Sequence, residues 1–256
     1  MDGLSLFSLK GRRALITGSS RGLGFAIATA LAGAGAEIVL NARDALALGA
    51  AAARLAETGA TTKAVAFDVT SRDSVEEAVG WVESELGPID ILVNNAGMQH
   101  RAPLEDFPED KFERIVQTNL TSVFTVGQIV ARHMIGRKRG KIVNICSLMS
   151  ALSRPSIAPY AATKAAVANL TRGMATDWAQ HGLNVNGIAP GYFKTELNEA
   201  LVANPEFNAW VEKRTPMGRW GEVAELGGAA IFLCSEASAF VNGHILYVDG
   251  AFTATV

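Results

Sequence analysis

The sequence predicts an α/β fold, with one doubly wound parallel sheet that carries helices on both faces. Short runs rich in Val, Ile and Leu alternate with longer helical runs along the whole chain, a pattern typical of a parallel sheet crossed by helices. The first apolar run leads into a glycine-rich turn and a helix, as in Rossmann-type folds. With 256 residues, 49% of them hydrophobic, residues 1–256 fit one large domain.

About seven strands are expected, because each run is short, apolar and free of internal proline. In chain order they are residues 13–17, 35–41, 63–67, 88–93, 141–146, 184–189 and 244–248. The runs between them favour helices through their Ala and Leu content, and Ser71 followed by Ser74 marks one helix start. The expected helices are residues 24–31, 45–57, 71–86, 108–134 and 161–179, two short helices within 195–215, and 223–235.

Composition and charge exclude several classes of function. A formal net charge of -2 gives no electrostatic reason to bind nucleic acid or an anionic membrane. The N-terminus lacks a signal peptide's basic start, and no segment approaches the ~20 apolar residues that span a bilayer, so we expect a cytoplasmic protein. Cys146 and Cys234 lie in separate apolar runs and predict buried thiols rather than a disulfide framework or a metal site.

A dinucleotide site is indicated by Gly18, Gly22 and Gly24, which stand between the first strand and its helix. Glycines at this place let backbone N–H groups approach a pyrophosphate at the helix N-terminus. A glycine-rich turn alone could equally be an ordinary loop. Its position directly after a strand and before a helix favours a binding function.

The end of the second strand predicts which dinucleotide binds. An acidic residue there would accept hydrogen bonds from an adenosine ribose, but residues 41–43 are Asn-Ala-Arg. Arg43, together with Arg21 from the glycine turn, is expected to bind a 2′-phosphate, which favours NADP(H). Asp44, the residue after Arg43, is an acid near the same strand end and therefore keeps NAD(H) as the alternative. Asp68, at the end of the third strand, is expected to hydrogen-bond the adenine.

Tyr160, Lys164 and Ser147 are the candidate catalytic residues. Tyr160 and Lys164 are four residues apart on an expected helix, so their side chains leave the same face. A neighbouring ammonium ion favours a phenolate, and we expect Lys164 to lower the pKa of Tyr160 from its usual value of about 10. Ser147, at the end of the fifth strand, can hold a substrate oxygen. Taken alone, the pair could also be an ordinary surface contact.

With these features together, the chain resembles the short-chain dehydrogenase/reductase family over essentially its whole length. The motifs that carry the resemblance are residues 17–24, 94–97, 119, 147, 160–164 and 190–191. It implies that Tyr160 is the acid/base, that Ser147 orients the substrate oxygen, that Lys164 also binds the nicotinamide ribose, and that Asn119 holds a water. The cofactor-binding residues it implies are Gly18, Ser20, Arg21, Gly22, Leu23, Gly24, Arg43, Asp68, Val69, Asn95, Ala96, Gly97, Tyr160, Lys164, Pro190, Gly191, Phe193 and Thr195. It further implies a homotetramer, and the chain departs from the family at Ala251, where a glycine is usual.

Within the family, the chain is most similar to the group that interconverts D-gluconate and 5-keto-D-gluconate, through residues 99–104, 143–147, 189–196, 213–216 and 218–221. A sugar acid needs a cation for its carboxylate. Arg154 and Arg101 are the candidates, beside Ser147 and Tyr160 at the reacting oxygen, although each arginine could equally be solvated at the surface. Residues 194–219 are expected to form a lid over the substrate.

Three other functions stay open. The basic run at residues 137–141 most simply solvates a turn, but it could also bind an acidic carrier protein, as in 3-oxoacyl-carrier-protein reductases. Another sugar or polyol dehydrogenase is a second enzymatic alternative. The non-enzymatic alternative is an NADP-sensing protein, because fold does not determine function. The complete set of Asn119, Ser147, Tyr160 and Lys164 argues against the last.

Overall fold

The structure, a computed structural model, describes residues 3–255 and contains one seven-stranded sheet. All pairs are parallel, in the order β3-β2-β1-β4-β5-β6-β7. The chain reverses its direction of winding between β1 and β4, which is where ligands bind in sheets of this kind. The predicted doubly wound parallel sheet is confirmed. The strands are β1 Arg13–Ile16, β2 Glu37–Leu40, β3 Thr62–Ala64, β4 Ile91–Asn94, β5 Gly140–Ile145, β6 Leu183–Pro190 and β7 Ile245–Val248.

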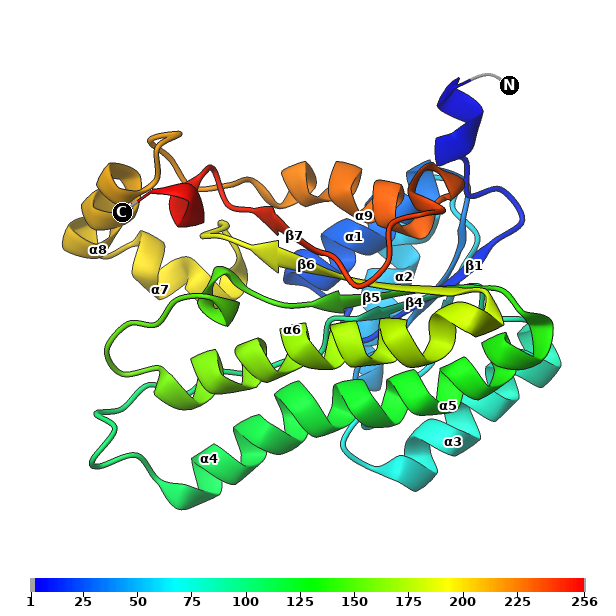
Figure 1. The fold of residues 1–256 in the computed structure, drawn as a ribbon, viewed down its shortest axis with the longest axis horizontal. Coiled ribbons are helices and arrows are strands. Elements are labelled where there is room, and N and C mark those ends of the chain that lie inside the picture. Colours follow the sequence, from blue (N-terminus) through cyan, green and yellow to red (C-terminus); the bar gives the residue numbers. More distant parts are fainter. Residues whose placement is uncertain (1–2, 256) are drawn as a thin grey trace.

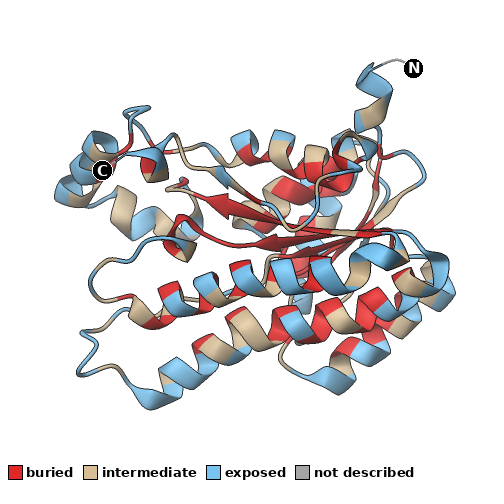
Figure 2. Ribbon diagram, in the orientation of Figure 1, coloured by how far each residue is buried: buried red, intermediate tan, exposed pale blue. Residues whose placement is uncertain are grey.

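Helices cover both faces of the sheet (Figure 1). One face carries α1 (Gly22–Gly33), α2 (Ala45–Ala56) and α9 (Gly227–Cys234), and the other carries α3 (Arg72–Trp81), α4 (Glu109–Val116), α5 (Ser122–Arg137) and α6 (Ala158–Trp178). Ile16 packs into the first core and its neighbour Leu15 into the second, because successive side chains of a strand point to opposite faces. Figure 2 shows the strands buried between the two helical layers. No described helix is both long and apolar enough to cross a membrane.

The helix expected at residues 108–134 is interrupted in the structure. It consists of α4, one π-helical turn at Gln117–Thr121, and α5. A π-helical turn accommodates an extra residue within a helix, often at a functional site. Asn119 lies in this turn and is fully buried. The expected helix therefore exists, but its uninterrupted course was a wrong prediction.

The third strand is shorter than predicted. β3 ends at Ala64 rather than at Phe67, and the residues after it are held differently. The side-chain amide of Asn41 donates to the carbonyl oxygens of Val65 (3.2 Å) and Phe67 (3.1 Å). A side chain at the end of β2 thus guides this segment towards Asp68.

The segment after β6 leaves the sheet and returns to it at one neck. The backbone N–H of Gly221 donates to the carbonyl of Tyr192 (2.8 Å), and that of Lys194 donates to the carbonyl of Gly221 (3.0 Å). Between these contacts lie a 3-10 turn (Glu196–Asn198), α7 (Glu199–Val202) and α8 (Pro205–Arg214), which Figure 1 shows beyond the end of the sheet. The two short helices predicted within residues 195–215 are present.

Candidate active site

A cavity of about 790 Å³ opens at the carboxyl ends of the strands. Its wall comes from the turn after β1, from the ends of β2, β4, β5 and β6, and from the first turns of α6. Every residue that the sequence assigns to the cofactor lines this cavity. Parallel strands bring their carboxyl ends to one edge of a sheet, and binding sites form there.

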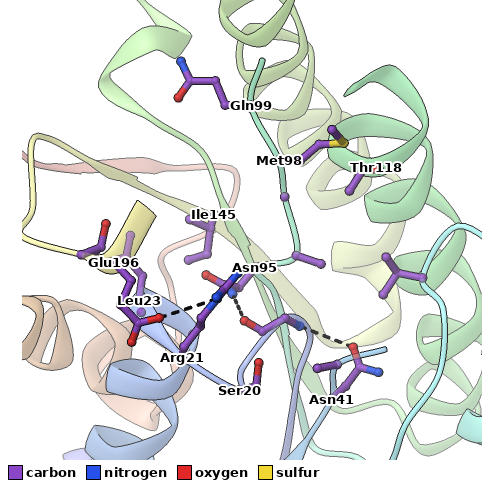
Figure 3. Close-up of a pocket in the computed structure, with 18 of the residues that line it drawn as sticks. Ser20, Arg21, Leu23, Asn41, Asn95, Met98, Gln99, Thr118, Ile145 and Glu196 are labelled. Carbon is purple, nitrogen blue, oxygen red and sulfur yellow. Dashed lines mark hydrogen bonds and ion pairs between the residues drawn. The ribbon is translucent and has the colours of Figure 1, made fainter. Parts of the chain in front are cut away.

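Two of the three glycines in the glycine turn are packed too tightly for a side chain. A Cβ on Gly24 would lie 2.4 Å from Asn95 Nδ2, and one on Gly18, whose φ is +61°, would lie 2.8 Å from the Cα of Ala96. Asn95 Nδ2 donates to the carbonyls of Thr17 (2.9 Å) and Gly18 (2.8 Å), and Figure 3 shows its side chain directed at the turn. The turn and the start of α1 thus keep a groove of bare backbone that fits a pyrophosphate.

Asn41, at the end of β2, has a role that sequence reasoning missed. Its Oδ1 accepts from the N–H of Gly18 (3.4 Å), while its Nδ2 donates to the segment after β3. It is almost fully buried. Asn41 therefore joins the glycine turn to the adenine side of the cavity (Figure 3). The combination of a turn-forming amide with a strand end was its only sequence signal.

The corner of the cavity where the sequence predicts the adenosine end of the cofactor, the adenosine corner, carries charges of both signs: Arg21, Arg43 and Arg114 against Asp44, Asp68 and Glu196. Arg21 and Arg43 line it, and Arg21 Nε lies 3.7 Å from Glu196 Oε2 across the mouth of the cavity (Figure 3). Asp44, which kept NAD(H) open, caps α2, because its Oδ1 accepts from the N–H groups of Leu46 and Ala47 (both 3.0 Å). Its carboxylate is therefore engaged in the helix start.

Asp68 lines the same corner of the cavity as Arg43. Burial opposes its ionisation, but hydrogen bonds from the N–H and hydroxyl of Thr70 (2.9 and 2.7 Å) and the charges of Arg43 and Arg114 outweigh it. The pKa of Asp68 is lowered as a result. Arg114 also lines the cavity and was not among the predicted residues. An ionised carboxylate here can accept hydrogen bonds from an amino group such as that of adenine.

Ser147, Tyr160 and Lys164 meet where β5 ends and α6 begins. Lys164 Nζ lies 5.8 Å from the centre of the Tyr160 ring and donates to the carbonyl of Ile145 (2.7 Å). Burial raises the pKa of Tyr160, and the neighbouring Ser147 hydroxyl only partly offsets it. The predicted depression of this pKa by Lys164 is not found, because burial is the largest effect on Tyr160 and Lys164 is not among the groups that shift it. Tyr160 is therefore a proton donor in this state.

The hydroxyl of Ser147 is oriented by its own chain. Its Oγ accepts from the N–H of Met149 (3.1 Å), so its own proton points towards the Tyr160 phenol with which it interacts. Ser150 connects this serine to α6, since its Oγ accepts from the N–H of Ser147 (3.3 Å) and donates to the carbonyl of Lys164 (2.9 Å). The two ends of the candidate catalytic segment are thereby held together.

Asn119 lies behind this group and does not line the cavity. Its Oδ1 accepts from the N–H of Met98 (2.8 Å), and its Nδ2 donates to the carbonyl of the same residue (2.9 Å). Nδ2 is also 3.4 Å from the Thr163 hydroxyl. Asn119 therefore fixes the loop after β4 against α6.

Arg101 and Arg154 do not line the cavity. They lie beside it, around Tyr192, which immediately follows Gly191. Burial lowers the pKa of Arg101, and the like charge of Arg154 adds to this effect. Arg154 is half-buried, with its guanidinium carbon 5.2 Å from the centre of the Phe207 ring on α8. The two arginines thus converge near the candidate catalytic group, on the side away from the glycine turn.

Comparisons with known proteins cover all or nearly all of the chain. A family model described as enoyl-(acyl carrier protein) reductase matches residues 18–253. The chain is 58% identical to a gluconate 5-dehydrogenase of Gluconobacter oxydans (100% of both chains) and 51% identical to a 5-keto-D-gluconate 5-reductase of Escherichia coli (98% of this chain, 99% of the other). It is also similar to the crystal structure of a gluconate 5-dehydrogenase from Burkholderia cenocepacia in complex with NADP and tartrate, with a TM-score of 0.97, 55% identity and 99% of each chain covered.

Proposed function

The chain belongs to the short-chain dehydrogenase/reductase family, and on that premise we propose that it is an NADP-dependent oxidoreductase that interconverts D-gluconate and 5-keto-D-gluconate. The observation that carries the proposed chemistry is the group of Ser147, Tyr160 and Lys164 at the inner end of the cavity. The proposed substrate rests on the similarity to a gluconate 5-dehydrogenase that is 58% identical over the full length.

The residues divide the reaction between them. NADPH, when bound, would supply the hydride to the carbonyl carbon. The protonated Tyr160 hydroxyl then gives its proton to the emerging alkoxide. Ser147 donates a hydrogen bond where negative charge develops on the substrate oxygen. Lys164 lines the cavity beside Tyr160 and would hold the nicotinamide ribose through its Nζ, a role supported by its position in the wall.

The preference for NADP(H) over NAD(H) rests on the adenosine corner. Arg21 and Arg43 can both reach an anion there, and Arg side chains bind phosphate well. Asn41 and Asp44, the residues nearest to a ribose-binding acid in position, are engaged in backbone hydrogen bonds. A relative that is 55% identical binds NADP.

A carrier-protein substrate is less well supported. In the basic run, Arg137 pairs with Glu83 (2.6 Å) and Arg139 with Asp90 (2.6 Å), so both charges are used within the chain. The run also leads into the first residues of β5, whose opposite end, Ile145, lines the cavity. An acidic protein bound to these residues would lie at the wrong end of the sheet. The simpler role, a solvated turn, is favoured.

The decisive experiment compares substrates and one variant. NADPH consumption is measured with 5-keto-D-gluconate, with other keto sugars and with a 3-oxoacyl carrier protein, and it is repeated with NADH. We expect 5-keto-D-gluconate and NADPH to give the highest kcat/KM. Tyr160→Phe should abolish turnover while NADPH still binds. Binding without turnover in the wild type would instead favour the NADP-sensing alternative, and turnover that survives in Tyr160→Phe would refute the mechanism.

We further propose that residues 194–219 form a lid and that the protein is a cytoplasmic homotetramer. The lid is supported by the neck at Gly221 and by Thr195 and Glu196, which line the cavity. The tetramer rests on the family resemblance alone. Light scattering after size-exclusion chromatography should give four times the subunit mass, and a monomer mass would contradict the proposal.

A further inference from the structure

The aromatic ring of Tyr192 is held by four other rings. Phe207 and Trp210 of α8, Trp220 beyond it and Phe252 near the C-terminus surround it at centroid distances of 5.8, 5.8, 5.6 and 5.5 Å. Three of the four contacts are edge-on, the arrangement that aromatic pairs favour. The direction of the Tyr192 side chain is therefore fixed before any substrate arrives.

The hydroxyl of Tyr192 is buried but has no hydrogen-bond partner among residues 3–255, and the same is true of Arg154 Nε. A buried polar group without a partner costs about 1–3 kcal/mol, so native chains seldom keep two of them close together. Both belong to one cluster, because burial raises the pKa of Tyr192 while the charge of Arg154, and a side-chain interaction with it too weak in geometry to satisfy either group, lower that pKa. Two unused donors side by side indicate a missing acceptor.

The cluster also lacks a negative charge. Arg101 and Arg154 are close enough that their charges repel each other, and neither forms an ion pair with a carboxylate of the described chain. Phe207 lies over the Arg154 guanidinium, which is half-buried, whereas Arg101 is exposed. An anion bound here would therefore meet two positive charges that no carboxylate of the described chain neutralises.

Tyr192 shares its packing with the reacting group, although it lines a smaller neighbouring pocket rather than the cavity itself. Tyr192 and Tyr160 pack against the same apolar cluster, formed by Leu148, Met149, Ile157, Ala161 and Phe252. Tyr160 is also near enough to raise the pKa of Tyr192 slightly, as the smallest of the effects on it. A substrate whose carbonyl lies at Tyr160 would place a group a few bonds away beside the unused donors. The cluster suits a carboxylate at the far end of a short polyol chain.

We propose that Tyr192 is a specificity-determining residue, whose hydroxyl donates a hydrogen bond to the substrate carboxylate that Arg154 binds through Nε. This inference rests on the proposed reduction of a keto sugar acid and adds the residue that selects the acid over uncharged ketones. The hydroxyl supplies a directed donor, while the arginines supply charge. The rigid ring fixes the distance between the carboxylate and the carbonyl that Tyr160 protonates.

The test uses Tyr192→Phe, which keeps all four ring contacts and removes only the oxygen. Tyr247→Phe, on β7 and partly exposed, is the matched control. The substrates are 5-keto-D-gluconate and its methyl ester, which lacks the charge. Loss of one hydrogen bond to a charged group should lower kcat/KM for the acid roughly 10- to 100-fold and change that for the ester little. The control should change neither.

A binding measurement separates this inference from the proposed function. Calorimetric titration of D-gluconate into the enzyme with NADPH should show a similar loss of affinity in Tyr192→Phe only. If the acid-to-ester ratio and the gluconate affinity both stay within about twofold of the wild type, the role of Tyr192 is refuted while the proposed function stands. If the wild type binds gluconate but reduces no keto sugar acid, the proposed function fails and the titration still decides on Tyr192. A wild type that binds no gluconate overturns both.

Discussion

Replacing Asn119 with alanine tests how the π-helical turn supports the site. The side-chain amide satisfies both the N–H and the carbonyl of Met98 and is fully buried. Asn119→Ala leaves these two backbone groups without partners, each at a cost of about 1–3 kcal/mol. The free energy of unfolding should therefore fall by about 2–6 kcal/mol. In a chain of this size, the melting temperature should fall by roughly 4–24 °C.

The assay is thermal unfolding followed by circular dichroism, with NADPH turnover measured on the same samples. Asn204→Ala is the control, because Asn204 Oδ1 accepts one backbone N–H, that of Phe207 (2.9 Å), at the exposed start of α8. Loss of such a cap costs about 1 kcal/mol. If Asn119→Ala lowers the melting temperature no more than Asn204→Ala does, Asn119 does not hold the loop after β4, and our reasoning about the turn is wrong.

Three further predictions follow from the geometry. Arg21→Ala and Arg43→Ala should each raise KM for NADPH about 10-fold or more while changing KM for NADH little, because a charged hydrogen bond to phosphate is lost; equal changes for both cofactors would remove the arginines from 2′-phosphate binding. Arg154→Ala should raise KM for 5-keto-D-gluconate far more than for its methyl ester, and steady-state kinetics that show equal losses would exclude carboxylate binding by this arginine. Arg219 lowers the pKa of Glu225 from 4.5 to about 2. The pair therefore stabilises the fold above pH 4.5, and its contribution disappears as the pH falls through about 2. In urea titrations Glu225→Gln should lose less stability over that pH range than the wild type does, and an unchanged pH profile would contradict the pairing.

Much of the site could be predicted because it depends on strand ends. Thr17, Asp68 and Ser147 are far apart in the chain, but each closes or follows a short apolar run. A parallel sheet brings such ends to one edge, so their convergence follows from topology alone. The glycine turn was equally accessible, since its residues are adjacent in sequence and only glycine fits the close approach of Asn95.

The residues that were missed act through contacts between distant segments. Asn41 joins the turn after β1 to the segment after β3, and Tyr192 depends on rings from α8 and from the C-terminus. Neither contact has a periodicity or spacing that a sequence displays. The residues of the π-helical turn around Asn119 continue the helical spacing of apolar residues on both sides of it. The pattern therefore predicted one continuous helix.

The spacing of Tyr160 and Lys164 predicted the wrong direction for the pKa of Tyr160, for a related reason. Residues four apart on a helix share a face, but the distance between charges depends on what else each group binds. Lys164 extends to the carbonyl of Ile145, and burial then dominates the titration of the phenol. Burial is a property of the assembled fold and cannot be read from two positions.

The neck between Tyr192, Lys194 and Gly221 bears on how enzymes of this architecture can diversify. Backbone hydrogen bonds between Gly221 and residues 192 and 194 already hold both ends of the intervening segment together. Each doubling of a loop's length costs only about 0.6 kcal/mol more in closure entropy. Insertions, deletions or wholesale exchange between these residues would therefore leave the sheet and the glycine turn intact. A transplanted segment from a relative with another substrate should fold on this base, which makes the neck a natural junction for recombination and for engineered chimaeras.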